Sequence, residues 1–221
     1  MNKLKRYLRE PINSITHGIG AVLSLIGLFL LLYKAIYHGS TGHIIAFSMF
    51  GLSMVLLYTA SSLFHALHVK QRTLLLLQKF DHSMIYVLIA GTYTPICLIV
   101  LEGSWKWGFL ITVWSLAIIG IIKKILWIGS PRWLSTSFYL GLSWLALIIF
   151  PTLMEKLPLA FLVWILLGGV AYTLGAVIYT LRKPNLIPDL LGSHEIWHLF
   201  VLAGTFCHFW AIYQFLPAYG G

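Results

Sequence analysis

The chain has 221 residues, of which 59% are apolar and only 10% are charged, and its mean hydropathy is +0.88. Soluble domains carry about 25% charged residues, so the composition excludes a soluble globular protein and indicates an integral membrane protein. The formal net charge is +9. Attraction of basic residues to anionic lipid explains this charge, and no nucleic-acid partner is expected.

Seven stretches are long and apolar enough to cross the roughly 30 Å hydrocarbon core as helices. We therefore predict an all-α, seven-helix transmembrane bundle that forms a single domain over residues 1–221, with a short basic segment at residues 1–11. The expected spans are Ile12 to Tyr33, His43 to Ala66, Asp81 to Leu101, Trp107 to Leu126, Trp133 to Phe150, Pro158 to Leu181 and Ser193 to Leu216.

The first span contains polar residues near its start. Its cleanly apolar part, Ile19 to Tyr33, has only 15 residues and is too short to cross the membrane alone. Asn13, Ser14, Thr16 and His17 are therefore expected in the first turns of this helix.

The distribution of basic residues predicts the orientation, because Lys and Arg concentrate in cytoplasmic loops. One set of breaks between spans holds 12 basic residues, namely Lys3, Lys5, Arg6, Arg9, Lys70, Arg72, Lys79, Lys123, Lys124, Arg132, Arg182 and Lys183. The alternate set holds 3, namely Lys34, Lys106 and Lys156. We expect a multi-pass cell-membrane protein, in the cytoplasmic membrane if it is bacterial, with its N-terminus in the cytoplasm and its C-terminus outside.

Five polar side chains from three spans are predicted to share one layer near the cytoplasmic surface. Ser61 and His65 fall in the last turns of the second span, and Asp81 falls in the first turn of the third. His194 and His198 occupy the first turn and a half of the seventh. Because an ionisable group inside a span costs about 2.5 to 3.5 kcal/mol at the helix centre, such a cluster is a candidate functional site.

The spacing of these residues favours a metal site. Residues four apart project from nearly the same helix face, which pairs Ser61 with His65 and His194 with His198. Three imidazoles at one depth match a catalytic zinc, which takes three protein ligands and keeps a fourth position open. Imidazole also suits copper, iron and nickel, so zinc is the favoured interpretation among several.

Structural roles are the alternative for each residue taken singly. Asp81 is suited to a helix N-cap, Glu195 to a favourable interaction with the helix dipole, and Ser61 to a hydrogen bond with the carbonyl four residues earlier. His17 and His82 lie at the same predicted depth and are candidates to support the ligands.

The string from His194 to His198 reads His-Glu-Xaa-Xaa-His, which is also the zinc-peptidase motif. A zincin commonly takes its third ligand downstream, yet no Asp or Glu follows Glu195. The only later histidine, His208, lies about 15 Å farther along the helix. We therefore interpret the string as a His-xxx-His pair that His65 completes.

At these residues the chain resembles the hemolysin III family, the bacterial branch of the progestin and adipoQ receptors. The resemblance is carried, in order, by Glu10-Pro11 with Asn13, Thr16 and His17, by Ser61-Ser62-Leu63-Phe64-His65, by Asp81-His82-Ser83, and by His194-Glu195-Ile196-Trp197-His198. It implies a seven-helix bundle with its N-terminus inside and a zinc ion held by His65, His194 and His198. It also implies catalytic roles for Asp81 and Ser61 at the metal's open position.

Related families include the alkaline ceramidases, so the expected function is zinc-dependent hydrolysis of a lipid amide in membrane lipid homeostasis. The expected partners are membrane lipids, including ceramide-like substrates. Two alternatives stay open: a receptor or sensor in which zinc is structural, and a membrane-lysing hemolysin. The uniformly apolar spans disfavour the second, because they offer no polar stripe to line a wide aqueous pore.

Overall fold

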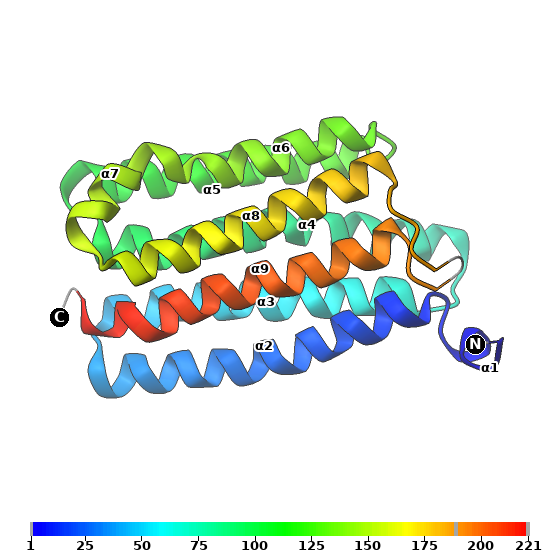
Figure 1. Ribbon diagram of the computed structural model, residues 1–221, viewed down its shortest axis with the longest axis horizontal. Helices are drawn as coiled ribbons and strands as arrows, with labels where there is room; N and C mark the ends of the chain where they lie inside the picture. Colours follow the sequence, from blue (N-terminus) through cyan, green and yellow to red (C-terminus); the bar gives the residue numbers. More distant parts are fainter. Residues whose placement is uncertain (1, 188–189, 220–221) are drawn as a thin grey trace.

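The computed structural model describes residues 2–187 and 190–219, and across them the chain is all-α (Figure 1). Helix formation satisfies every backbone hydrogen bond within the segment, which hydrocarbon requires. The helices are α1 (Asn2–Tyr7), α2 (Pro11–His38), α3 (Thr41–Ala66), α4 (Gln71–Pro95, continued by a π-helical segment, Ile96–Val100), α5 (Gly103–Leu126), α6 (Arg132–Trp144), α7 (Ala146–Lys156), α8 (Leu159–Leu181) and α9 (Ser193–Phe215).

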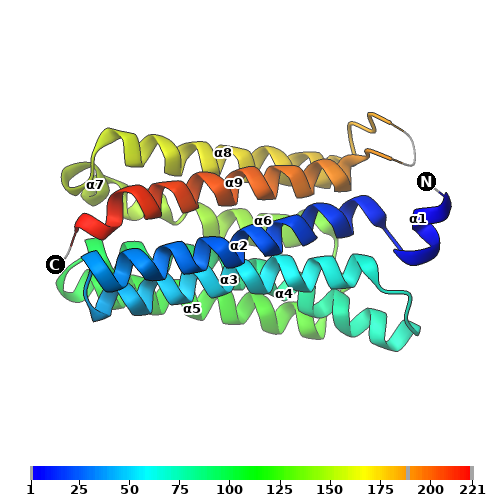
Figure 2. The same ribbon diagram turned by 90° about the horizontal axis from the view of Figure 1, so that it is seen from below.

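Seven helical segments among the described residues are long and apolar enough to span a membrane, which confirms the predicted fold class. Consecutive spans pack side by side, and α9 closes the bundle by packing against both α8 and α2. Figures 1 and 2 show the two termini at opposite ends of the bundle. We call the end at which α2 and α9 begin the N-terminal end.

The third span begins earlier than predicted. Helix α4 starts at Gln71, because the four leucines Leu74–Leu77 continue the helix past the polar pair Gln78 and Lys79 that interrupts the apolar run. Asp81 therefore lies in the helix interior, and both its placement in the first turn and its interpretation as an N-cap are wrong. Figure 2 shows the first turns of α4 extending past the neighbouring spans. Asp81 still reaches the expected layer, where it lines one cavity together with Ser61 and His198.

The fifth span is broken at Leu145 into α6 and α7, which hydropathy alone did not predict. The Tyr93 hydroxyl on α4 donates toward the carbonyl oxygens of Leu142 (3.1 Å) and Ser143, and accepts the N–H of Ala146 (2.8 Å). A break at membrane depth is tolerated when freed backbone groups find partners inside the protein. Tyr93 supplies those partners here.

Helix α3 is tied to the C-terminal end of α9 by a buried histidine. His43 Nδ1 accepts the N–H of Ser40 (3.1 Å), so its Nε2 carries the proton and donates to the carbonyl oxygen of Leu216 (3.2 Å). This histidine has a structural role and lies at the end of the bundle opposite the predicted polar layer.

Close packing of α2 on α3 depends on Gly51. A Cβ atom built there would lie 2.4 Å from Leu28 Cδ1 and 3.1 Å from Leu28 Cα, whereas one at Gly108 would meet nothing within 4 Å. We expect Gly51→Ala to destabilise the bundle by about 1 to 3 kcal/mol through overpacking. Gly108→Ala, the matched control, should leave the thermal unfolding temperature in detergent unchanged or slightly higher. Equal unfolding temperatures for the two variants would contradict this packing.

Candidate metal centre

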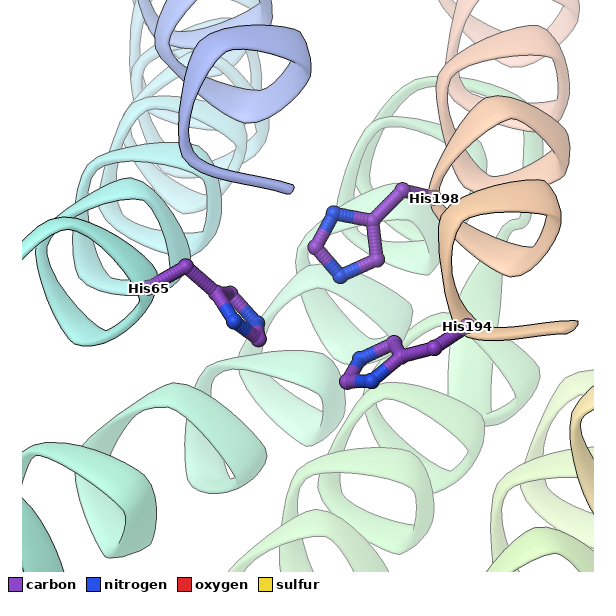
Figure 3. A group of neighbouring side chains, drawn as sticks. All are labelled: His65, His194 and His198. Carbon is purple, nitrogen blue, oxygen red and sulfur yellow. The ribbon is translucent and has the colours of Figure 1, made fainter. Parts of the chain in front are cut away.

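Three histidine side chains from two helices meet at the N-terminal end. His65 lies in the last turn of α3, and His194 and His198 lie in the first turns of α9. One ligand atom from each lies within 4.8 Å of the other two, and the ring centroids are 4.9 to 5.1 Å apart. Figure 3 shows the rings converging on one space from opposite sides. The three residues are therefore close enough to hold one metal ion.

The donor atoms fit a metal. His65 Nε2 and His198 Nδ1 are fully buried, and neither has a hydrogen-bond partner among the described residues. A buried polar atom left without a partner costs about 1 to 3 kcal/mol, which a coordinate bond would offset. Neutral imidazole nitrogen is the ligand that zinc, copper, iron and nickel accept.

Glu10 orients the first of these ligands. His65 Nδ1 lies 2.6 Å from Glu10 Oε2, so the ring donates to the carboxylate and directs Nε2 toward the other two histidines. Arg9 Nη1 is 2.6 Å from Glu10 Oε1, and Asn13 Nδ2 donates to Oε2 at 3.1 Å. Metal-binding histidines commonly donate their other N–H to a carboxylate in this way.

The charge state of Glu10 follows from the same contacts. Burial by itself raises the pKa of the carboxyl group, but the hydrogen bond and charge of His65, the hydrogen bond from Asn13 and the charge of Arg9 outweigh it and lower the pKa to about 2. Glu10 is therefore an anion at neutral pH. The orientation of His65 by Glu10 was not predicted from the sequence, where Glu10 entered only as part of the Glu10-Pro11 motif.

Asp81 and Ser61 lie beside the histidines at the polar end of a cavity. Both residues are buried, and both line this cavity together with His17 and His198. Asp81 Oδ2 lies 3.1 Å from His82 Nδ1, which also lies 2.9 Å from the carbonyl oxygen of Gln78. The structure thus brings together all five predicted site residues, although Asp81 does not belong to the group that could share one ion.

His17 packs against His198 and makes no hydrogen bond through its ring to the described residues. Its ring stacks on His198 with centroids 3.6 Å apart, and both of its nitrogens are buried without a hydrogen-bond partner among the described residues. His17 therefore supports the position of His198 by stacking, whereas His82 acts on Asp81 through a polar contact.

Glu195 turns away from the metal position. Its Oε2 accepts the N–H of Gly192 (3.0 Å) at the start of α9, and its Oε1 accepts Asn13 Nδ2 (3.0 Å) from α2. Oε2 thus caps the start of its own helix and Oε1 joins α9 to α2, which argues against the general-base role that a zinc peptidase requires.

The cavity is long and mostly apolar. It encloses about 1260 Å³ of empty space, part of which is open to the surroundings. It follows α4 and its π-helical continuation from Asp81 to Ile96, about 22 Å at the helical rise, and residues of α2, α3, α6, α7, α8 and α9 also line it. Such a shape suits an extended acyl chain whose polar end lies at the histidines.

The chain is similar to proteins of a known family. Residues 5–209 match the family described as Haemolysin-III related. The chain belongs to the haemolysin III family. Hemolysin-3 of Bacillus cereus is 40% identical over 213 residues, which are 96% of this chain and 94% of that protein. Hemolysin-3 homolog of Bacillus subtilis (strain 168) is 42% identical over 203 residues, 92% of each chain.

A more distant likeness extends to animals. The human monocyte to macrophage differentiation factor is 26% identical over 176 residues, which are 76% of this chain and 69% of that protein. The family resemblance predicted from the ordered motifs is therefore confirmed, and the chain is a multi-pass membrane protein of the haemolysin III type.

Each of the three histidines should be needed for metal binding. We expect His65→Ala, His194→Ala and His198→Ala to lose stoichiometric metal, measured by elemental analysis of purified protein. His208→Ala is the matched control, because His208 also lies on α9 but its Nε2 contacts the carbonyl oxygen of Ile165 (3.1 Å). Full metal content in all three site variants would rule out this centre.

Loss of the Glu10 carboxylate should weaken the centre without removing a ligand. We expect Glu10→Gln to lower metal affinity about 10- to 100-fold, as outer-shell changes typically do. Competition with a chelator of known affinity measures the change. Unaltered affinity, with the bundle still folded, would show that Glu10 does not orient His65.

Proposed function

We propose that this haemolysin III protein is a zinc-dependent hydrolase that cleaves an amide bond in a membrane lipid. The observation that carries the proposal is the juxtaposition of a long apolar cavity with three histidines, a buried carboxylate and a hydroxyl at one end of it. Three nitrogen ligands with space beside them are typical of catalytic zinc sites.

Zinc, when bound, supplies a Lewis acid that polarises a carbonyl and brings the pKa of water to about 7. His65, His194 and His198 would hold the ion, and Glu10 would keep His65 in the required orientation. The remaining chemistry belongs to side chains of the cavity.

Asp81 would act as general base and then as general acid. Its carboxylate, which lies beside His82, would accept a proton from the attacking water and return it to the leaving amine. Ser61, which lines the same cavity, would donate a hydrogen bond to this carboxylate or to the developing oxyanion.

The substrate would be positioned by its acyl chain. Leu88, Ile89, Ile96, Leu147 and Phe150 line the apolar part of the cavity away from the polar residues. Burial of the chain there places the amide at the histidines and keeps bulk water from the reacting atoms.

A second candidate is a non-catalytic sensor or receptor in which the metal is structural. Asn13 on α2 bonds to Glu10 and Glu195, and Glu10 bonds to His65 on α3, so the centre joins α2, α3 and α9 whether or not turnover occurs. In that case Asp81→Asn should change neither folding nor signalling.

Turnover measurements separate these functions. In nanodiscs with a ceramide-like lipid amide, we expect hydrolysis that a zinc chelator abolishes. Asp81→Asn should lower the rate about a hundredfold to ten-thousandfold, as loss of general acid–base catalysis does, while retaining metal. Glu195→Gln is the matched carboxylate-to-amide control and should retain most activity.

Two results would contradict the hydrolase. Equal turnover with and without chelator would exclude zinc catalysis. Stoichiometric metal without turnover of any lipid amide or ester would favour the structural role.

A further inference from the structure

A second, polar cavity lies at the N-terminal end beside the candidate metal centre. It holds about 820 Å³ of empty space, part of it open to the surroundings, between α4, α5, α6, α8 and α9. Its polar and charged lining residues are Gln78, His82, Lys124, Ser130, Arg132, Ser135, Thr136, Tyr139, Tyr179 and His194. None of the lining residues is an Asp or Glu, so the cavity is basic in character.

Lys124 is a buried cation in this cavity. It is only 3% exposed, and its Nζ donates to Ser135 Oγ at 2.8 Å. No described carboxylate lies within ion-pair distance of it. An ammonium group has three N–H donors, and a buried charge is costly unless it is paired and hydrogen-bonded. Lys124 Nζ also lies 5.9 Å from the centroid of the Tyr139 ring, and Ser135 is its only hydrogen-bond partner among the described residues, so an anion in the cavity would complete its contacts.

The surrounding groups are suited to an oxyanion. Ser130 Oγ lies 2.9 Å from Ser135 Oγ, which extends a line of hydroxyls from Lys124. The Arg132 guanidinium stacks over Tyr179 at 4.8 Å from the ring centroid, at the exposed side of the cavity. An ammonium, a planar guanidinium and hydroxyl donors together match the several acceptor oxygens of a phosphate group.

We propose that this cavity binds a phosphate group. The basic end of the bundle is the end predicted to face the cytoplasm, where anionic phospholipid is concentrated, and basic pockets between membrane helices there bind lipid headgroups. The headgroup phosphate of an anionic phospholipid is thus the favoured source, and free inorganic phosphate offers the same chemistry. The site does not depend on lipid hydrolysis at the metal centre.

The two cavities are neighbours but differ in the charged residues that line them. Ile85, Tyr139 and Trp197 line both, whereas Lys124 and Arg132 line only the second. His194 belongs both to the metal group and to the second cavity, so a phosphate there would lie close to the metal ligands. Binding must therefore be measured in metal-free protein as well, to separate capture by Lys124 from capture by a metal.

The test is native mass spectrometry of the full chain in detergent, titrated with phosphatidylglycerol, with and without chelator. We expect Lys124→Gln to weaken phosphatidylglycerol binding about tenfold to a hundredfold in both states, as loss of a charge-assisted hydrogen bond does. Lys123→Gln is the matched control, because it removes the same charge from the adjacent position, where Lys123 Nζ lies over the Phe138 ring and outside the cavity. It should change binding less than twofold.

A second variant keeps the test valid if Lys124→Gln does not fold. Arg132→Gln alters an exposed residue and should weaken binding severalfold. Competition with inorganic phosphate separates the two sources: displacement of the lipid by millimolar phosphate assigns the site to free phosphate, and no displacement assigns it to the lipid headgroup. Equal losses for Lys123→Gln and Lys124→Gln, or binding that chelation abolishes, would overturn the proposal.

Discussion

Hydrocarbon offers no hydrogen-bond partner, so each polar side chain within these seven helices must find its partner inside the protein. This constraint explains why the ionisable residues of the candidate centre, which come from α2, α3, α4 and α9, lie together at the N-terminal end. Asn13 pairs with Glu10 and Glu195, and Asp81 lies against His82. Among the buried nitrogens without a hydrogen-bond partner in the described residues, those of His65 and His198 belong to the group that could hold one ion.

The Glu10–His65 contact connects the fold with the candidate chemistry. Glu10 precedes the first span, and its backbone N–H donates to the carbonyl oxygen of His65 at 2.9 Å, while Arg9 Nη2 donates to that of Phe64 at 2.6 Å. The segment before α2 is therefore fastened to the last turn of α3. Because the same carboxylate orients the imidazole, the geometry of the ligand depends on the packing of these two helices.

Much of the fold could be predicted from sequence, because the seven apolar stretches that form the spans can be located from hydropathy alone. The orientation predicted from the basic residues stays a prediction. The start of α4 was wrong by ten residues, since an apolar window ends at polar residues while a helix continues through Gln78 and Lys79. The break at Leu145 could not be predicted from sequence, because the side chain that bonds to the freed backbone groups, Tyr93, lies on another helix. Among the site residues, spacing and depth brought the three histidines together correctly. The orienting role of Glu10, the bond between Glu195 and Asn13, and both cavities could not be predicted, because each depends on contacts between segments distant in sequence.

The ligands are divided between the second span and the final one, and this division sets an order of events during biosynthesis. His65 is synthesised with the second span, whereas its two partners are synthesised only with the seventh. A chain truncated before Ser193 retains six of the seven spans and only one of the three imidazoles. A metal ion held by all three histidines would therefore bind only after α9 has docked between α2 and α8.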